Sequence, residues 1–275
     1  MAAIFQKRST RTRFSFEAGA HHLGAHAIFC NKDDIHLGVS ESVKDTTLVL
    51  SKLVNLIAAR VYEHSVLEEM AQFSKVPIVN ALSDAHHPTQ ALADLMTIYE
   101  HFGYLKGLRV AWVGDGNNIL SSLLIACTKM KMHVASSTPT GYAPCVETLN
   151  YAEKMADING TEILVTTDPE RAVKNADVVI TDTWISMGQE EEKAKRLKAF
   201  EGYQITLDML KHAKKNWIFL HCLPRKMEEV CDHVFYHKQS LVFQEAENRK
   251  WTTMAVLANL IKGYDPKYIT EQPRF

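Results

Sequence analysis

The segment GLRVAWVGDG, residues 107–116, decides the fold class of this 275-residue chain. Its apolar run stops at a glycine-rich turn, and residues 117–130 follow with apolar side chains at helical spacing. Further apolar runs rich in β-branched residues come at residues 133–137, 162–166, 177–182 and 217–221. Helical stretches lie between them, one of which we expect to begin near Pro144 with this proline in its first turn. Continuous apolar strands that alternate with helices indicate a parallel sheet covered on both faces.

The first hundred residues repeat this alternation less regularly. Strands are predicted at residues 25–29, 56–61 and 77–81, and helices at residues 12–23, 45–54, 65–73 and 88–102. We place a domain boundary near residues 103–107, so that residues 1–103 form a first domain and residues 104–246 a second. Residues 247–275 form an amphipathic helix and tail that we expect to pack back on the first domain. The predicted fold class is α/β, with two domains, each a mainly parallel sheet with helices on both faces, and an active site in the cleft between them.

Composition excludes several classes of function. The 31 Lys and Arg balance 32 Asp and Glu, so no global charge favours nucleic acid or a membrane surface. No apolar run approaches the roughly 18 residues that span a bilayer, which argues against stable membrane insertion. The five cysteines are scattered without a C-x-x-C pair, as in a protein of a reducing compartment. The basic N-terminus has no apolar segment of the secretory type; it could pass for a transit segment, but we reject that reading because these residues carry chemistry.

Polar and reactive residues follow the predicted strands. In open α/β sheets ligands bind outside the carboxyl ends of the strands, so such residues mark a binding edge. The segments concerned are Arg60, residues 83–88, residues 114–118, Asp182 and residues 221–224. Any one of them is more often an ordinary solvated loop residue, but five concurrent cases favour a site.

Residues 9–12, Ser-Thr-Arg-Thr, open a predicted helix. Ser and Thr are N-cap residues, and the backbone N–H groups of a first helical turn bind anions with help from the helix dipole. Arg11 sits poorly in that turn unless an anion is bound, and a bidentate guanidinium–phosphate contact would offset the cost. A basic solvated N-terminus explains the same residues about equally well when they are taken alone.

Three other patterns are weak. Gly114 and Gly116 form a G-x-G, but Ile119 holds the place of the third glycine, which counts against a nicotinamide cofactor. The histidine pairs show no carboxylate spacing, so surface or hydrogen-bonded histidines are favoured over a metal site. Cys222 has no evident activating partner, and a positioned polar group is at least as good a reading as a nucleophile.

Together these segments resemble the aspartate/ornithine carbamoyltransferase family. The shared motifs are STRTR at residues 9–13, Arg60, and H-P-x-Q at residues 87–90. Three further motifs resemble the ornithine branch: GDGNN at residues 114–118, D-x-x-x-S-M-G at residues 182–188, and HCLPR at residues 221–225. The resemblance extends from Ile4 to about Tyr264 and is strongest to the animal mitochondrial enzymes, through stretches such as EAENRKW.

The resemblance implies a role for each matching residue. The phosphate of carbamoyl phosphate is assigned to Ser9, Thr10, Arg11 and Thr12, with Arg60 bridging the phosphate and the carbonyl oxygen. The carbamoyl group is assigned to His87, Gln90, the backbone at Cys222 and Leu223, and the side chain of Arg249. Ornithine is assigned to Asn118, Asp182, Ser186 and Met187. His36 is expected to reach the phosphate site of a neighbouring subunit, because the family forms homotrimers with shared active sites.

The implied reaction is carbamoyl transfer to the δ-amine of L-ornithine, which gives L-citrulline and phosphate and needs no cofactor or metal. The ammonium, with a pKa near 10, must first lose a proton, and Asp182 and a thiolate-capable Cys222 are the candidates to orient and accept it. Arg60, His87 and Thr12 are expected to donate to the carbonyl oxygen, and one such donor is typically worth about 2.7–4 kcal/mol. Closure of the S-M-G loop over ornithine would exclude water.

Alternatives remain at this stage. A related carbamoyltransferase could use aspartate or acetylornithine, although an aspartate site would need extra cations where residues 189–192, QEEE, are acidic. The chain starts just before the phosphate motif, so the resemblance also implies a first domain without its first helix and strand, and no transit peptide. A shortened, non-catalytic isoform or subunit is therefore a second reading. By resemblance the location is the mitochondrial matrix, and otherwise the cytoplasm.

Overall fold

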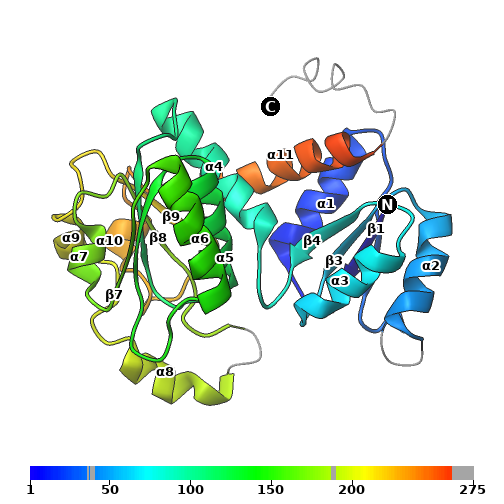
Figure 1. The fold of residues 1–275 in the computed structure, drawn as a ribbon, viewed down its shortest axis with the longest axis horizontal. Coiled ribbons are helices and arrows are strands. Elements are labelled where there is room, and N and C mark those ends of the chain that lie inside the picture. The colour runs from blue at the N-terminus through cyan, green and yellow to red at the C-terminus, as the bar shows by residue number, and fades with distance from the viewer. Residues whose placement is uncertain (36, 38–40, 187–189, 262–275) are drawn as a thin grey trace. The chain divides into compact units, whose positions relative to one another are not determined.

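The computed structural model describes residues 1–35, 37, 41–186 and 190–261 (Figure 1). By its contacts the chain divides into two compact units, Met1–Thr89 with Glu247–Phe275, and Gln90–Ala246. The division falls in the first turn of helix α4 (Pro88–Phe102), so nearly all of α4 belongs to the second unit. The boundary that we expected near residues 103–107 follows this helix instead. The described part of helix α11 (Val242–Leu260) groups with the first unit from Glu247 onward.

The first unit contains a four-stranded parallel sheet. Its strand order is β2 (Ile28–Asn31), β1 (Ala2–Phe5), β3 (Ile57–Arg60), β4 (Ile78–Leu82). Strand β1 was not predicted from the sequence, because its four residues form a short apolar run without alternation. This strand lies between two others and is fully buried, and a strand covered on both faces has no polar positions to reveal its period.

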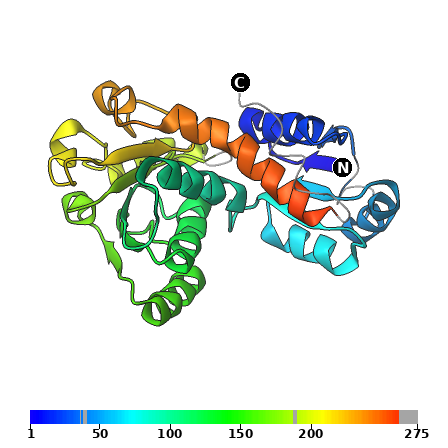
Figure 2. The same ribbon diagram turned by 90° about the horizontal axis from the view of Figure 1, so that it is seen from above.

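Helices cover both faces of this sheet. On one face, α2 (Val43–Leu53) and α3 (His64–Phe73) pack against β1 and β3. On the other, α1 (Thr10–His22) and the end of α11 pack against β3 and β4. The two helices lie side by side in Figures 1 and 2. Gly19 allows this approach, because a Cβ there would lie 3.2 Å from Met254 Cγ. The part of α11 from Glu247 onward thus belongs to the core of the first unit.

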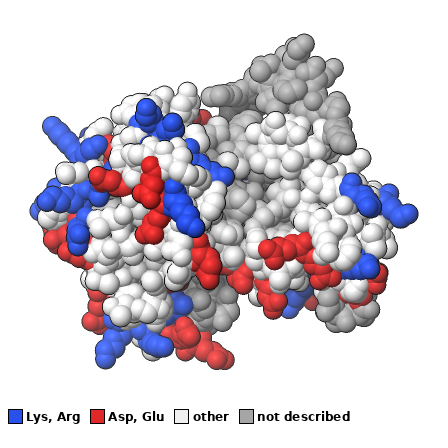
Figure 3. All heavy atoms as spheres, viewed as in Figure 1, with Lys and Arg blue, Asp and Glu red and all other residues white. Residues whose placement is uncertain are grey.

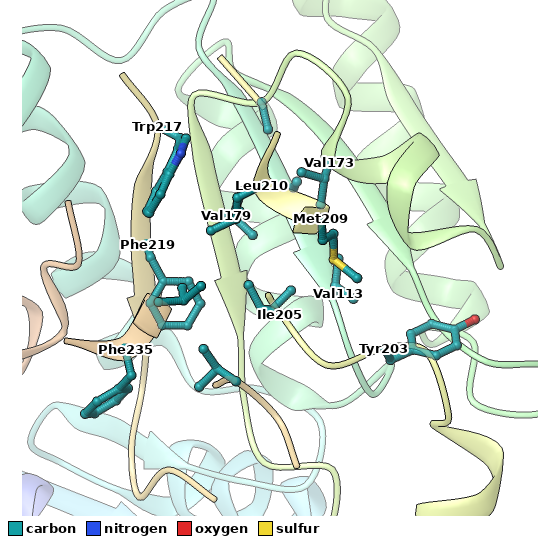
Figure 4. Packing of buried hydrophobic residues seen from close by; sticks show 14 of the residues in the cluster. Val113, Val173, Val179, Tyr203, Ile205, Met209, Leu210, Trp217, Phe219 and Phe235 are labelled. Atoms are coloured by element: carbon teal, nitrogen blue, oxygen red, sulfur yellow. The ribbon is translucent and has the colours of Figure 1, made fainter. Parts of the chain in front are cut away.

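The second unit contains a five-stranded parallel sheet. Its strand order is β7 (Ile163–Thr166), β6 (His133–Ser137), β5 (Arg109–Val113), β8 (Val178–Thr181), β9 (Ile218–His221). Val110 and Trp112 of β5 pack under α4, α5 (Asn118–Lys129) and α6 (Val146–Asn159). Ala111 and Val113 point to the opposite face, toward α7 (Pro169–Val173), α9 (Leu207–Leu210) and α10 (Asp232–Phe235). Figure 4 shows this second cluster, in which Phe219, Ile205 and Met209 interdigitate beside β8.

The predicted fold class is confirmed, since both sheets are parallel and covered on both faces. The strand at residues 133–137 and the helix at residues 88–102 have the predicted bounds. Pro144, however, precedes the N-cap Cys145 of α6 and is not a first-turn residue. Basic and acidic side chains are interspersed over the second unit on the face shown in Figure 3, in keeping with the balanced composition. No described helix is both long and apolar enough to cross a membrane.

Candidate active site

The predicted site residues follow the strands at which each sheet changes direction. In the first unit the chain runs from β1 outward to β2, and then from β3 outward to β4. Residues 9–12 follow β1 and Arg60 ends β3, so they flank the point where the strand order reverses. In the second unit Gly114 follows β5 and Asp182 follows β8, on the two sides of the equivalent point. Ligands bind at such switch points, so the topology places one candidate subsite in each unit.

The anion-binding end of α1 forms as predicted. Ser9 is its N-cap, in extended conformation, and its Oγ accepts a hydrogen bond from the backbone N–H of Thr12 at 3.2 Å. Thr12 itself is buried, while α1 has no acidic residue in its first turn. The helix therefore presents uncompensated N–H dipoles next to Arg11, which favours a bound anion.

Three arginines concentrate positive charge in this unit. Arg60 is buried, and desolvation together with Arg249 and Arg11 lowers its pKa to about 10. Its Nε has no hydrogen-bond partner among the described residues. Desolvation and neighbouring like charges both disfavour the charged form of this guanidinium, and a bound anion would stabilise that form.

Arg249 of α11 contacts two other segments of the first unit, the first turn of α1 and residues 87–89. Its Nη2 donates to Thr12 Oγ1 at 3.0 Å and to Thr89 Oγ1 at 3.1 Å, and its Nη1 lies 3.4 Å from His87 Nε2. Thr89 was not predicted as a site residue; it lies between His87 and Gln90 of the H-P-x-Q motif, and only its position in that motif could have indicated it. These contacts place the α11 guanidinium beside the first turn of α1.

His87 is held neutral. Burial, followed by the charges of Arg249, Arg60 and Arg11, places the pKa of its imidazole well below the ordinary value. A guanidinium only donates hydrogen bonds, so the ring accepts at Nε2 and carries its proton on Nδ1, which faces Thr89 Oγ1 at 3.3 Å. His87 is thus a neutral polar group in a cationic pocket.

In the second unit, Asp182, His221 and Cys222 bring their polar atoms within 4.8 Å of one another. Asn117 adds a fourth group, since its Nδ2 donates to Asp182 Oδ2 at 3.1 Å. The Oδ1 of Asn117 caps α5 by accepting from the N–H groups of Ile119 and Leu120. Asn117 therefore orients Asp182, while Asn118 is the first residue of α5.

The protonation states of this cluster differ from our expectation for Cys222. Burial raises the pKa of the Asp182 carboxyl, and this rise is opposed by His221 and by a hydrogen bond from the Cys222 thiol. Burial and the carboxylates of Asp182 and Glu245 raise the pKa of that thiol well above its ordinary value. The predicted thiolate is therefore not supported: Cys222 is a thiol that donates to Asp182, and Asp182 is the group able to accept a proton.

The same three residues have the donor types of a metal site. However, His221 Nδ1 accepts from the backbone N–H of Leu223 at 2.9 Å, and His221 Nε2 lies 3.0 Å from the buried carboxylate of Glu229. Both ring nitrogens are already hydrogen-bonded, so metal binding would have to break one of these bonds. The arrangement instead fixes the orientation of the ring between Leu223 and Glu229, and it holds Leu223 in a left-handed conformation with φ 57°.

The glycine-rich turn after β5 is shaped by packing. A Cβ on Gly116 would lie 2.4 Å from Tyr142 O and from the carbonyl carbon of Ala143, so only glycine fits. The preceding Asp115 forms a buried ion pair with Arg196 Nη1 at 3.0 Å, and the same nitrogen donates to Trp184 O at 2.9 Å. Arg196, in α8 (Lys193–Ala199), was not predicted, and it connects the turn to the segment that follows Asp182.

Comparison with known proteins decides the family. The carbamoyl-P binding domain of aspartate/ornithine carbamoyltransferases matches residues 1–100, and their Asp/Orn binding domain matches residues 106–260. The chain belongs to the aspartate/ornithine carbamoyltransferase family.

Similar members of this family are named for ornithine. The mitochondrial ornithine transcarbamylase of Gallus gallus is 54% identical over 267 residues, which cover 97% of this chain and 75% of the relative. The mitochondrial ornithine carbamoyltransferase of Aquarana catesbeiana is 54% identical over 98% of this chain and 77% of its own length. Among solved structures, the ornithine carbamoyltransferase of Pyrococcus furiosus has a TM-score of 0.93 and 48% identity, with 96% of this chain and 85% of that chain covered.

Two carbamoyltransferase motif residues, His36 and Met187, lie outside the described residues. Ser186 is described and half-buried at the end of the segment that follows Asp182. The remaining assigned residues divide between the units: Ser9, Thr10, Arg11, Thr12, Arg60, His87 and Arg249 in the first, and Gln90, Asn118, Asp182, Ser186, Cys222 and Leu223 in the second.

Proposed function

We propose that this chain transfers the carbamoyl group of carbamoyl phosphate to the δ-amine of L-ornithine, giving L-citrulline and phosphate. The observation that carries the proposal is the buried Arg60 with the neighbouring charges of Arg11 and Arg249; Arg11 and Arg60 lie in the residues that match the carbamoyl-P binding domain. The buried Asp182 of the Asp/Orn binding domain supplies the proton acceptor that an ammonium substrate requires.

The proposed reaction begins with deprotonation. Asp182 takes a proton from the δ-ammonium of ornithine, and the Cys222 thiol holds the carboxylate oriented. The neutral amine then attacks the carbonyl carbon, and its lone pair forms the new C–N bond. The C–O bond to phosphate breaks, its electron pair leaves with the phosphate, and an oxygen of the departing phosphate accepts the second proton from the nitrogen.

Charge on the carbonyl oxygen is stabilised by Arg60, Thr12 and His87 in this proposal. For His87 to donate to that oxygen its proton must move to Nε2, which requires Arg249 to turn from the ring toward the phosphate. Ser9, Thr10 and Arg11 would hold the phosphate, and Asn118 and Ser186 the ornithine α-amino acid group.

A citrulline assay with ornithine, acetylornithine and aspartate tests the proposal. We expect carbamoyl phosphate to yield product only with L-ornithine. A folded sample that forms no product with any of the three amines would refute the activity and leave the non-catalytic reading. An unchanged rate in Arg60→Ala would refute its assignment as oxyanion donor, because one such donor is worth about 2.7–4 kcal/mol.

We further propose a homotrimer in which His36 reaches the phosphate site of a neighbouring subunit, and a location in the mitochondrial matrix. The mitochondrial names of the relatives support the location. Sedimentation of the purified protein measures its oligomeric state. Subcellular fractionation of cells that express the protein measures its location.

A further inference from the structure

Glu245 is a buried carboxylate to which the sequence assigned no role. It lies in the first turn of α11 and is 1% exposed. Its Oε1 accepts from Gln90 Nε2 at 2.7 Å, and its Oε2 accepts from the backbone N–H of His221 at 2.8 Å. One side chain therefore binds, through separate oxygens, the two segments assigned to the carbamoyl group.

The first contact fixes the orientation of the Gln90 amide. The same nitrogen also donates to Asp94 Oδ1 at 2.8 Å, so both hydrogens of the NH₂ group face buried carboxylates. A flipped amide would place its oxygen against those two carboxylates, which is repulsive. Gln90 therefore keeps its oxygen on the side away from Asp94 and Glu245 and acts there as an acceptor.

The second contact fixes the start of the loop after β9. The His221 N–H is held by Glu245, and the His221 ring in turn holds the N–H of Leu223 at 2.9 Å. The conformation of residues 221–223, including the left-handed Leu223, is therefore tied to the same carboxylate. Hydrogen bonds to a buried charged group are strong, so this fixes the loop tightly.

We propose that Glu245 is a positioning residue that makes the site select a phosphate donor carrying an NH₂ group. A carbamoyl group differs from an acetyl group in offering two N–H donors where acetyl offers a methyl. Glu245 positions the two segments that the resemblance assigns to the carbamoyl group: it orients the Gln90 amide directly, and it holds the backbone at residues 221–223 through the His221 N–H. The inference rests on the proposed function.

The test compares Glu245→Gln with Glu245→Asp and with Glu247→Gln, a matched control on the same helix whose side chain is exposed. Glu245→Gln replaces one carboxylate oxygen by an NH₂ group. This NH₂ group must then face the N–H donor of either Gln90 or His221, and one of the two hydrogen bonds is lost. Glu245→Asp keeps the charge but is too short to reach both partners. For each variant we would measure the KM for carbamoyl phosphate and the inhibition constants of acetyl phosphate and inorganic phosphate.

We expect both Glu245 variants to raise the KM for carbamoyl phosphate at least about tenfold. This factor corresponds to the free energy of one lost charge-assisted hydrogen bond. The inhibition constants of acetyl phosphate and inorganic phosphate should stay within about twofold, since neither ligand has the NH₂ group. Equal losses for all three ligands would indicate a merely structural role and overturn the proposal, as would no loss for carbamoyl phosphate.

A double-mutant cycle with Gln90→Ala provides an independent measurement. If Glu245 acts partly through Gln90, the loss from Glu245→Gln becomes smaller in the Gln90→Ala background. Full additivity would overturn the Gln90 part of the mechanism. Citrulline formation by the wild-type protein is measured first, so that its absence, which refutes the proposed function, is distinguished from a failure of the Glu245 variants alone.

Discussion

Replacing Arg60 by methionine should stabilise the ligand-free protein while strongly reducing its stabilisation by phosphate. The lowering of the Arg60 pKa from the ordinary guanidinium value to about 10 corresponds to about 3 kcal/mol, because each tenfold change in a protonation equilibrium is worth about 1.4 kcal/mol. That free energy is the cost of holding the guanidinium charged in the pocket without an anion. Since the folded-state pKa is depressed, the full cost is present below about pH 10 and is relieved only as the pH rises through this value.

Methionine is nearly as long as arginine but neutral, so Arg60→Met removes the charge and keeps most of the packing. We expect a net gain of about 1–3 kcal/mol in phosphate-free buffer at pH 7.5, part of the full value being offset by imperfect packing. For a chain of this size each kcal/mol raises the apparent Tm by about 2–4 °C. Phosphate at about 100 times its Kd should add about 2.7 kcal/mol to the wild type and far less to the variant.

The assay is thermal unfolding of both proteins with and without inorganic phosphate. Arg171→Met, in which an exposed arginine of the second unit is replaced, is the matched control and should neither shift the Tm nor change the phosphate response. The reasoning is refuted if Arg60→Met melts below the wild type in phosphate-free buffer. It is equally refuted if phosphate stabilises the variant as much as the wild type, because the buried charge would then not be the anion-binding group.

Three further predictions concern the second unit. Asp182→Asn should lower kcat by about 10²–10⁴, and an unchanged rate in this variant would exclude Asp182 as the base. In the wild type, kcat/KM should fall at acid pH as Asp182 becomes protonated. This fall should occur above the ordinary pKa of a carboxyl group, because burial raises the pKa of Asp182. Cys222→Ser should keep most of the activity in the citrulline assay, because a hydroxyl also donates to Asp182, whereas Cys222→Ala should lose more; the reverse order would restore a thiolate role. Gly116→Ala should destabilise the protein by about 1–3 kcal/mol and weaken ornithine binding, as its Cβ meets backbone at 2.4 Å. Gly160→Ala, at a helix C-cap with open space around it, is the control and should leave ornithine binding unchanged in the same titration.

The sequence by itself determined the α/β class, because continuous apolar runs alternating with helical stretches are a local pattern that each segment carries alone. It also located the anion-binding start of α1, since N-caps act within a single turn, and the strand-end positions of Arg60 and Asp182. Strand β1 was not predicted, because a fully buried strand of four residues has no polar residues that alternate with the apolar ones.

Only the tertiary structure decided how distant residues act together. Arg249 meets Thr12 across 237 residues of sequence, and Glu245 meets Gln90 across 155, contacts that no local pattern contains. Protonation was likewise a tertiary property: Cys222 looked capable of forming a thiolate in sequence, but its burial beside Asp182 and Glu245 keeps it a thiol. Motifs name the reactive groups, whereas burial and neighbouring charges, which arise only on folding, determine what those groups do.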